Sequence, residues 1–242
     1  MEKSQIKVVG FKNAALHPDE SGNIVRIDFD SAQSALSKSW IDLIHLSEDL
    51  FKENTFETLW NLQPEEPGFV MMPRKNPETG KMERAKIPVP RKQQAYLKPY
   101  WFSGMQHNPE PMPEAFAPFL EHANSLEYCE TDEPEFNEML VNWYADGNDN
   151  IGMHSDDPKQ HVKGNKHGFL IYSLTLWEPI GIPRIFRIKP RSGGSDRIDI
   201  PLEDRLLVIM GGEMQDHYKH GVPATKKETG RRINITLRQF QD

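Results

Sequence analysis

The sequence NWYADGNDNIGMHSDD, residues 142–157, predicts a strand that enters a turn-rich loop and ends beside two metal ligands. We expect the strand at 139–145 and the loop at 146–150, where Asp, Asn and Gly cluster. His154 and Asp156 follow, and residues two apart in an extended chain point to the same side. Such a pair can supply two ligands of a 2-His-1-carboxylate triad, the arrangement that leaves coordination positions open on non-haem Fe(II).

Short strand-like runs separated by turn residues continue through the C-terminal half of the chain. One separating turn, PRSGG, lies at 190–194, and no run alternates with helices as parallel sheets require. Many short strands over about 100 residues favour an antiparallel sandwich or a jelly roll. The runs lie at 139–145, 169–177, 184–188, 197–200, 206–210 and 232–240.

The first 65 residues, 1–65, predict an N-terminal extension of strands and helices. We expect an antiparallel pair at 6–11 and 23–29, joined by a turn that contains Pro, Asp and Gly. A helix is expected from Ser39, because a serine followed by an acidic residue three positions later resembles a capping box. A second helix is expected at 56–62 from the spacing of its apolar residues.

Residues 66–242 are expected to form the main domain, in one compact unit with the extension. A lid for substrate recognition is predicted at about 69–104. Its proline-rich part, 69–95, should be loop with short strands, and its aromatic part, 96–104, should be a strand. Residues 113–123 predict a helix with proline in its first turn.

Composition narrows the class of protein. The net charge is -7, and no apolar run approaches the ~20 residues of a membrane span. The N-terminus lacks the apolar segment of a secretion signal. Cys129 is a single cysteine, so an internal disulfide is excluded and a reducing compartment is favoured. We expect an intracellular monomer of the nucleus or cytoplasm that does not contact membranes.

A basic stretch at 74–98 stands out in this acidic chain. It holds eight basic and two acidic side chains, a local charge of +6 (8 minus 2). Such a patch can follow a phosphate backbone while the rest of the surface stays acidic, which makes nucleic acid, DNA or RNA, the expected partner. The alternative is a solvated, mobile loop, and charge alone does not separate the two.

The third metal ligand should come from another strand, because a jelly roll brings distant strands together. The segment HYKHGVP at 217–223 is the obvious source. Its Gly and Pro favour extended or turning chain over a helix, and His220 is the favoured ligand. The other histidines have weaker contexts, and His161 and His167, flanked by Lys and Gly, are interpreted as ordinary loop residues.

The last predicted strand carries a polar face. Period-2 alternation places Arg232, Asn234, Thr236 and Arg238 on one side and apolar residues on the other. An unpaired buried guanidinium is costly, so this face must meet either water or an anionic ligand. If the face meets water, the strand has one side in solvent. If it meets an anionic ligand, the two arginines can form a site for a dicarboxylate.

Together these motifs resemble the AlkB-type Fe(II)/2-oxoglutarate oxygenases, which remove alkyl groups from nucleic-acid bases. The resemblance covers about residues 88–240 and implies a mainly β fold with flanking helices (α+β) and a double-stranded β-helix (jelly-roll) core. It rests on HSD at 154–156, HGVP at 220–223, RINITLR at 232–238, PRKQQAY at 90–96, YWFSG at 100–104, and NWY at 142–144 with its following Asp-Gly.

The resemblance also implies roles for residues at matching positions. The Fe(II) ligands are His154, Asp156 and His220. The residues that bind 2-oxoglutarate are Asn142, Tyr144, Arg232, Asn234 and Arg238. The substrate contacts are Phe102, Tyr100, Arg91 and Lys92, with Phe102 and the His154 ring on either side of a flipped base. The catalytic residues nearest the base are Asp157 and Arg91.

The implied reaction uses O2 and 2-oxoglutarate to hydroxylate an N-methyl carbon of the 1-methyladenine or 3-methylcytosine type, releasing formaldehyde, succinate and CO2. The alternatives are an AlkB-type oxygenase of protein or lipid, a catalytically silent nucleic-acid-binding module, and a jelly-roll zinc protein. Pro158 stands where several repair members have an acidic contact to the base, so the choice of base stays open. Strand preference also stays open, because the lid carries Met82 and few aromatic residues.

Overall fold

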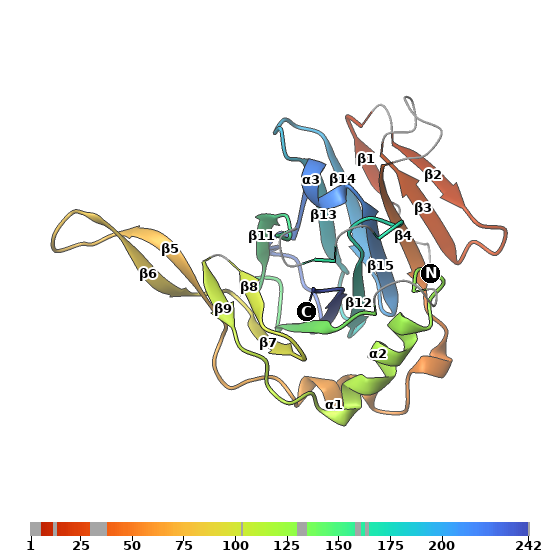
Figure 1. Cartoon of the computed structure of the whole chain (residues 1–242), viewed down its shortest axis with the longest axis horizontal. Helices are drawn as coiled ribbons and strands as arrows, with labels where there is room; N and C mark the ends of the chain where they lie inside the picture. Colours follow the sequence, from red (N-terminus) through yellow and green to blue (C-terminus); the bar gives the residue numbers. More distant parts are fainter. Residues whose placement is uncertain are drawn as a thin grey trace.

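Two antiparallel sheets form the body of the protein (Figure 1). The computed structural model describes residues 6–11, 14–29, 38–102, 104–129, 135–157, 161–162 and 165–241. Ser103 and Pro158, which belong to two of the sequence motifs, lie outside these ranges. The mainly β, jelly-roll fold predicted from the turn-punctuated strands is confirmed.

The larger sheet has the strand order β2-β3-β4-β15-β12-β17-β10-β7. Its strands are β2 (Ala15–Pro18), β3 (Ile24–Asp28), β4 (Ser39–His45), β15 (Leu206–Gly212), β12 (Ile171–Trp177), β17 (Arg232–Arg238), β10 (Glu138–Tyr144) and β7 (Lys92–Tyr96). The last strand of the chain, β17, therefore lies in the middle of the sheet between β12 and β10. Every side chain of β17 and β10 is buried.

The smaller sheet has the order β1-β14-β13-β16-β11. Its strands are β1 (Lys7–Val9), β14 (Arg197–Leu202), β13 (Arg184–Pro190), β16 (Tyr218–Val222) and β11 (Ile151–His154). An apolar cluster fills the space between this sheet and β3, β4 and β15, with Ile188, Ile198 and Val208 among its members. This cluster ends where polar side chains of β10, β17, β11 and β16 begin to line a pocket.

Two helices cover the outer face of the larger sheet, α1 (Thr55–Trp60) and α2 (Ala117–Asn124). Leu59 of α1 and Phe119 of α2 pack with Tyr172 and Ile235, whose strands point their apolar sides outward here. Both helices were predicted. A third helix, α3 (Met214–His217), directly precedes β16. No helix of the described residues is long and apolar enough to cross a membrane.

The helix predicted from Ser39 is wrong, because Ser39–His45 is β4, hydrogen-bonded between β3 and β15. Its side chains alternate between two cores. Trp40 joins the cluster under the helices, while Ile41 and Leu43 join the cluster between the sheets. A strand that is apolar on both faces shows no alternation in sequence, so its spacing resembled that of a helix.

The predicted pair of 6–11 with 23–29 is also wrong. β3 pairs with β2, while β1 pairs with β14 in the other sheet. The turn itself was located correctly: Asp19 accepts a hydrogen bond from the amide of Ile24 at 3.1 Å, and Gly22 has a φ of 70°. The domain boundary at residue 65 stays a prediction, although β3 and β4 share a sheet with β15.

The predicted lid region is a long hairpin followed by a short one. β5 (Phe69–Lys75) and β6 (Met82–Pro88) pair only with each other and project from the body at the left of Figure 1. β8 (Tyr100–Phe102) and β9 (Met105–His107) form the shorter hairpin. The strand predicted at 96–104 is present as β8. The short strands expected within 69–95 are β5, β6 and the start of β7, and the first two form a regular hairpin instead of loop.

Candidate metal centre

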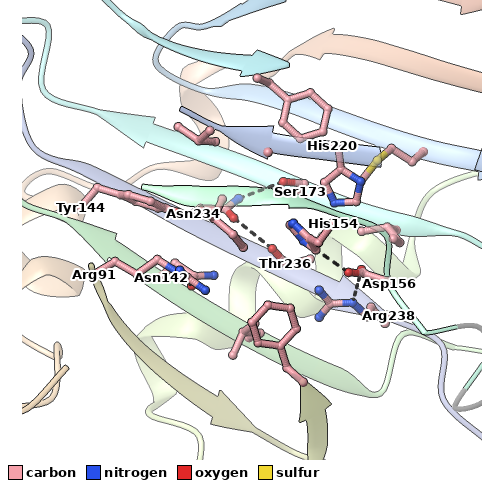
Figure 2. A pocket seen from close by; sticks show the side chains of 18 of the residues that line it. Arg91, Asn142, Tyr144, His154, Asp156, Ser173, His220, Asn234, Thr236 and Arg238 are labelled. Atoms are coloured by element: carbon pink, nitrogen blue, oxygen red, sulfur yellow. Dashed lines mark hydrogen bonds and ion pairs between the residues drawn. The ribbon is translucent and has the colours of Figure 1, made fainter. Parts of the chain in front are cut away.

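His154 and His220 lie directly opposite each other in the ladder between β11 and β16. Their ring centroids are 4.4 Å apart (Figure 2). The close approach of the two strands depends on Gly221, because a Cβ there would lie 2.8 Å from the carbonyl oxygen of Ile151. The glycine of the HGVP motif therefore has a local physical reason: it lets the second histidine approach the first.

Asp156 follows β11 and completes the cluster. Its Oδ2 accepts a hydrogen bond from Arg238 Nε at 2.8 Å, while its Oδ1 lies 3.6 Å from His154 Nε2. Oδ1 is buried and has no hydrogen-bond partner in the described part of the chain. His154 Nδ1 lies 2.9 Å from the carbonyl oxygen of Gly152, a contact that makes Nδ1 the protonated nitrogen and leaves Nε2 as a ligand.

These three residues fit a metal ion. One ligand atom from each of His154, Asp156 and His220 can be chosen so that all lie within 4.8 Å of one another. An orphaned carboxylate oxygen beside two imidazoles is the donor set of a facial triad, which suits Fe(II) and leaves positions open for a chelating ligand. The predicted ligands are thus brought together in space.

The electrostatics of the cluster favour metal binding. Burial lowers the pKa of His154 and lowers that of His220 to about 3, so both rings are neutral and their lone pairs are available. Burial acts to raise the pKa of Asp156, but the positive charge of Arg238, which also donates a hydrogen bond to it, outweighs burial and holds that pKa well below its usual range. The carboxylate is therefore ionised throughout the physiological range.

Arg238 connects the metal ligands to a buried acid in β10. Its Nη1 donates to Oε2 of Glu138 at 2.8 Å, and its guanidinium lies 4.5 Å from the ring centroid of Tyr100. Glu138 is completely buried. Burial raises the pKa of Glu138 to about 7, with Arg238 acting in the opposite direction.

The polar face of β17 forms one wall of the pocket, as the sequence predicted. Arg232, Asn234, Thr236 and Arg238 line it together with Asn142 and Tyr144 of β10. All six are buried, so the alternative of a solvent-facing strand is wrong. The apolar residues between them, such as Ile233 and Ile235, pack under the helices.

Arg232 is the side chain in this wall that most clearly needs an anion. Its Nη2 donates to the Thr175 hydroxyl at 3.0 Å, and its guanidinium lies 4.9 Å from the ring centroid of Tyr144. Its Nη1 is buried with no hydrogen-bond partner among the described residues. Burial lowers the pKa of Arg232 to about 10. A buried guanidinium with an open donor is costly unless a ligand such as a carboxylate pairs with it.

Arg91 lies beside the same wall. Its Nε donates to Oδ1 of Asn142 at 2.8 Å, and its Nη2 donates to Oε1 of Gln93 at 3.0 Å. A third bond reaches the carbonyl oxygen of Asn150 in the loop before β11. Arg91 therefore fixes Asn142, one of the predicted cosubstrate residues, in addition to any contact with a base.

Aromatic rings close the pocket on the side of β8. The rings of Tyr100 and Phe102 are nearly parallel, and Phe102 meets His154 edge to face at 5.7 Å between centroids and 78° between planes. A base between Phe102 and His154 requires parallel, more widely separated rings. The predicted sandwich therefore implies a movement of one ring when a base enters.

Two predicted residues do not line the pocket. Lys92 is half-buried in β7, and Asp157 is exposed beyond the metal ligands. The interpretation of His161 as a loop residue is wrong, since His161 is buried beside Phe240, with ring centroids 4.9 Å apart. Its flanking Lys and Gly gave no sign of that long-range packing.

Sequence reasoning missed Glu138 and Ser173. Ser173 accepts a hydrogen bond from Asn234 Nδ2 at 2.9 Å and orients that amide. Glu138 shares its face of β10 with Asn142 and Tyr144, four and six residues later, and this period-2 spacing was a signal that could have found it. Its partner, Arg238, is a hundred residues away and was not predictable from spacing.

A jelly roll whose pocket holds a His-Asp-His cluster and an open guanidinium defines a non-haem metal site with room for an acidic ligand. The chain belongs to the 2OG-Fe(II) oxygenase superfamily, whose family model matches residues 53–238. That family implies Fe(II), 2-oxoglutarate and O2, and the cluster of His154, Asp156 and His220 is able to bind the metal.

Within this superfamily the chain is AlkB-like. It is 33% identical over 162 residues to "DNA oxidative demethylase ALKBH2" of Mus musculus, covering 63% of this chain and 62% of that protein. It is also 33% identical over 111 residues to "Alpha-ketoglutarate-dependent dioxygenase alkB homolog 3" of Rattus norvegicus, covering 43% of this chain and 35% of that protein. The chain thus spans about three fifths of the length of the first relative.

A solved structure supports the fold. "The structure of OsALKBH1" matches with a TM-score of 0.50 and 18% identity, covering 82% of this chain and 96% of that one. At this identity the likeness concerns the jelly-roll architecture alone.

Proposed function

We propose that the protein is an Fe(II)/2-oxoglutarate-dependent dioxygenase that oxidatively demethylates N-alkylated bases in DNA or RNA, of the 1-methyladenine or 3-methylcytosine type. One observation carries the proposal. A single buried pocket joins the His-Asp-His cluster to the open donor of Arg232 on the opposite wall. The similarity to a DNA oxidative demethylase supports the substrate class.

His154, Asp156 and His220 would hold Fe(II). With 2-oxoglutarate and O2, the bound iron supplies the oxidising power that hydroxylates an N-methyl carbon, and the products are formaldehyde, succinate and CO2. The chain's own part is to bind and orient. Arg232 and Tyr144 take the distal carboxylate of 2-oxoglutarate, while Arg238 lies on the side of Asp156 for the other carboxylate.

Amides complete the cosubstrate wall. Asn234 is held by Ser173 and Thr236, and Asn142 is held by Arg91, so both amides are fixed before a ligand arrives. A wall prepared in this way requires little reorganisation on binding. The aromatic side of the pocket excludes water from the reacting carbon.

The substrate would enter from the side of Phe102 and the β5–β6 hairpin. A modified base in a strand must leave its stack to reach a buried metal, and an aromatic ring is a suitable surface for it. Basic side chains follow the hairpin, among them Lys81, Arg84 and Lys86. They suit a phosphate backbone, and we place the activity inside the cell, in a reducing compartment, with the protein as a monomer.

Two other functions compete with this one. An AlkB-type oxygenase of protein or lipid would keep the metal and cosubstrate walls but would not need a basic hairpin. A silent nucleic-acid-binding module would not need the open donor of Arg232 or the orphaned oxygen of Asp156. Structural zinc usually takes four ligands in a closed tetrahedron, whereas the residues that the structure describes supply three here, so zinc is disfavoured.

Mass spectrometry of methylated oligonucleotides tests the proposal. The full chain is incubated with Fe(II), 2-oxoglutarate and oligonucleotides carrying 1-methyladenine, 3-methylcytosine or N6-methyladenine, as DNA and RNA, single and double stranded. We expect loss of a methyl group from at least one substrate together with succinate, and no reaction for Asp156→Ala. Binding of oligonucleotides without succinate would identify a silent module, and succinate without demethylation would point to another substrate.

A further inference from the structure

We infer that Ser155 and Gln215 are positioning residues: their side chains tie the segment that carries Asp156 to the segment that carries His220. The inference rests on the proposed function, because it takes Asp156 and His220 as metal ligands. Gln215 belongs to α3 and is buried, and Ser155 is the half-buried residue between His154 and Asp156. Neither of them lines the pocket, so each acts through Asp156.

The ladder between β11 and β16 ends before it reaches Asp156. β11 ends at His154, whose ladder partner is His220, and Ser155 and Asp156 follow outside any strand. If the ladder continued in the same register, Asp156 would lie opposite Tyr218. The main-chain amide of Asp156 is buried, so it needs a partner that the ladder no longer supplies. Side chains must therefore take over where the backbone pairing stops.

Two hydrogen bonds that involve side chains replace the backbone pairing. Ser155 Oγ donates to the carbonyl oxygen of Tyr218 at 2.7 Å. The amide of Asp156 donates to Oε1 of Gln215 at 3.0 Å. Both acceptors lie in the continuous segment 214–222, which forms α3 and β16 and also carries His220. The proposed carboxylate ligand is thereby held to the same segment as one proposed histidine ligand.

The surroundings of Gln215 indicate that its oxygen is the required group. A main-chain amide can only donate, so the bond from Asp156 turns Oε1 toward that residue and Nε2 away from it. Nε2 lies 3.7 Å from Met210 Sδ, and a thioether is a weak acceptor. Burying an amide is costly unless it forms hydrogen bonds, so packing alone would favour an apolar side chain at this position. The feature that a glutamine adds here is the bond to Asp156.

These two contacts differ from that of Arg238, which binds the carboxylate itself. Arg238 Nε donates to Oδ2 of Asp156 at 2.8 Å and so orients the side chain. Ser155 and Gln215 instead hold the main chain from which that side chain extends. Oδ1 of Asp156 then lies 3.6 Å from His154 Nε2, buried without a hydrogen bond to any described residue. Loss of either main-chain contact should let the carboxylate move away from the two imidazoles and lower metal affinity.

The test measures metal binding by the full-length protein without 2-oxoglutarate. Gln215→Met removes the acceptor and keeps the length of the side chain, and Ser155→Ala is the milder, second variant should the first not fold. The matched control for Gln215 is Gln239→Met. Gln239 is equally buried outside the pocket, its Oε1 accepts from Asn165 at 2.8 Å, and its Nε2 lies 3.6 Å from Cys129 Sγ.

The matched control for Ser155 is Ser125→Ala. Ser125 Oγ also donates to a main-chain carbonyl, at 2.8 Å, but at the end of α2. Ser155→Thr is a conservative variant that keeps the hydroxyl. Mn(II) affinity is measured by electron paramagnetic resonance, circular dichroism checks the fold, and each folded variant is crystallised.

We expect Mn(II) affinity to fall about 10- to 100-fold in Gln215→Met and in Ser155→Ala, as for other groups that orient metal ligands. Ser155→Thr and both controls should stay at the parent value. The crystal structures of the two weakened variants should show Asp156 displaced from His220.

Parent-like affinity in folded Gln215→Met or Ser155→Ala overturns the inference. So does lost affinity with Asp156 in its original place, or an equal loss in the controls. Mn(II) binding by the unsubstituted protein separates the two proposals. If that binding is absent, the proposed function fails, and if it is present, the variants test the positioning residues alone.

Discussion

His154 and His220 are cross-strand partners in the β11–β16 ladder, so the backbone itself sets the separation of the two imidazoles that we propose as metal ligands. Directly opposed residues in an antiparallel pair have Cβ atoms about 4.5–5.5 Å apart, close enough for both side chains to reach one ion. Only Asp156 has to be positioned by side-chain contacts, through Arg238 and through Gln215, which accepts from its amide. We therefore expect metal affinity to be most sensitive to substitutions that alter the position of the Asp156 carboxylate.

Replacing Asp156 with Ala should abolish Mn(II) binding and 2-oxoglutarate turnover. The reason is the loss of the only anionic ligand in the described cluster, which leaves two neutral imidazoles. Electron paramagnetic resonance and succinate release provide the readouts, and circular dichroism checks the fold. The matched control is Asp157→Ala, which removes the neighbouring, exposed carboxylate and should retain Mn(II) affinity. Turnover at the parent rate in Asp156→Ala would remove Asp156 from the metal site.

Replacing Arg232 with Met should raise the KM for 2-oxoglutarate about 10- to 100-fold. This corresponds to loss of a charge-assisted hydrogen bond of about 1.5–3 kcal/mol. The unliganded fold should lose little, because the bond from Arg232 to Thr175 is offset by removal of a buried guanidinium with an open donor. Initial rates at varied 2-oxoglutarate give the KM. The control is Arg187→Met, which removes a partly exposed arginine of β13 that pairs with Asp199 of β14. An equal change of KM in both variants would contradict the assignment.

His161 should make the protein acid-sensitive. Burial lowers its pKa to about 2, so the folded state stays neutral where the unfolded chain, with a pKa of about 6.5, takes up a proton. The unfolded state then binds more protons, and stability falls as pH drops below about 6.5. His161→Gln should remove about 1.4 kcal/mol per pH unit of this loss. Urea unfolding near pH 7 and near pH 5 gives the change in the free energy of unfolding with pH for the parent and for His161→Gln. An equal change in the two proteins would refute the effect.

Neutralising the β5–β6 hairpin should weaken oligonucleotide binding. Lys81→Gln, Arg84→Gln and Lys86→Gln together should lower the slope of log K against log salt by about 2 to 3, since each lost phosphate contact removes roughly 0.7–0.9. Fluorescence anisotropy of a labelled oligonucleotide at several salt concentrations gives the binding constants from which this slope is calculated.

The control for the hairpin carries an equal change of charge elsewhere. Lys7→Gln, Lys38→Gln and Lys52→Gln remove three exposed cations from the N-terminal region. β1 and β4 of this region lie at the opposite end of the long axis from the hairpin (Figure 1). This control should keep the parent slope. If both triple variants change the slope equally, overall charge explains binding and the hairpin has no special part.

The grouping of the proposed metal ligands and of the polar side chains of β17 in one pocket was predictable from sequence, because each depends on spacing along one strand or strand end. His154 with Asp156 and Arg232 with Arg238 follow the period of two that an extended chain imposes. The third ligand, His220, needed a jelly roll to bring it near, and a neighbouring glycine marked it. The fold class followed from turn punctuation between short strands.

What the sequence concealed depends on contacts between distant segments. Glu138 accepts a hydrogen bond from Arg238 in another strand, and no sequence feature near either residue predicts this pair. β4 looked helical because Trp40 and Ile41 enter different cores, so both faces of the strand are apolar. His161 resembled a loop residue because its burial comes from Phe240 at the far end of the chain.

The hairpin of β5 and β6 pairs only with itself, and most of its outer residues are exposed, including Met72 and Met82. Substitutions at such surface positions usually change stability by no more than about 0.5 kcal/mol. The pocket residues of β10 and β17, in contrast, lie on strands whose side chains are buried on both faces. We therefore expect the hairpin to tolerate substitutions more readily than the buried strands. Residues that contact a partner can then change during evolution while the residues of the pocket are retained.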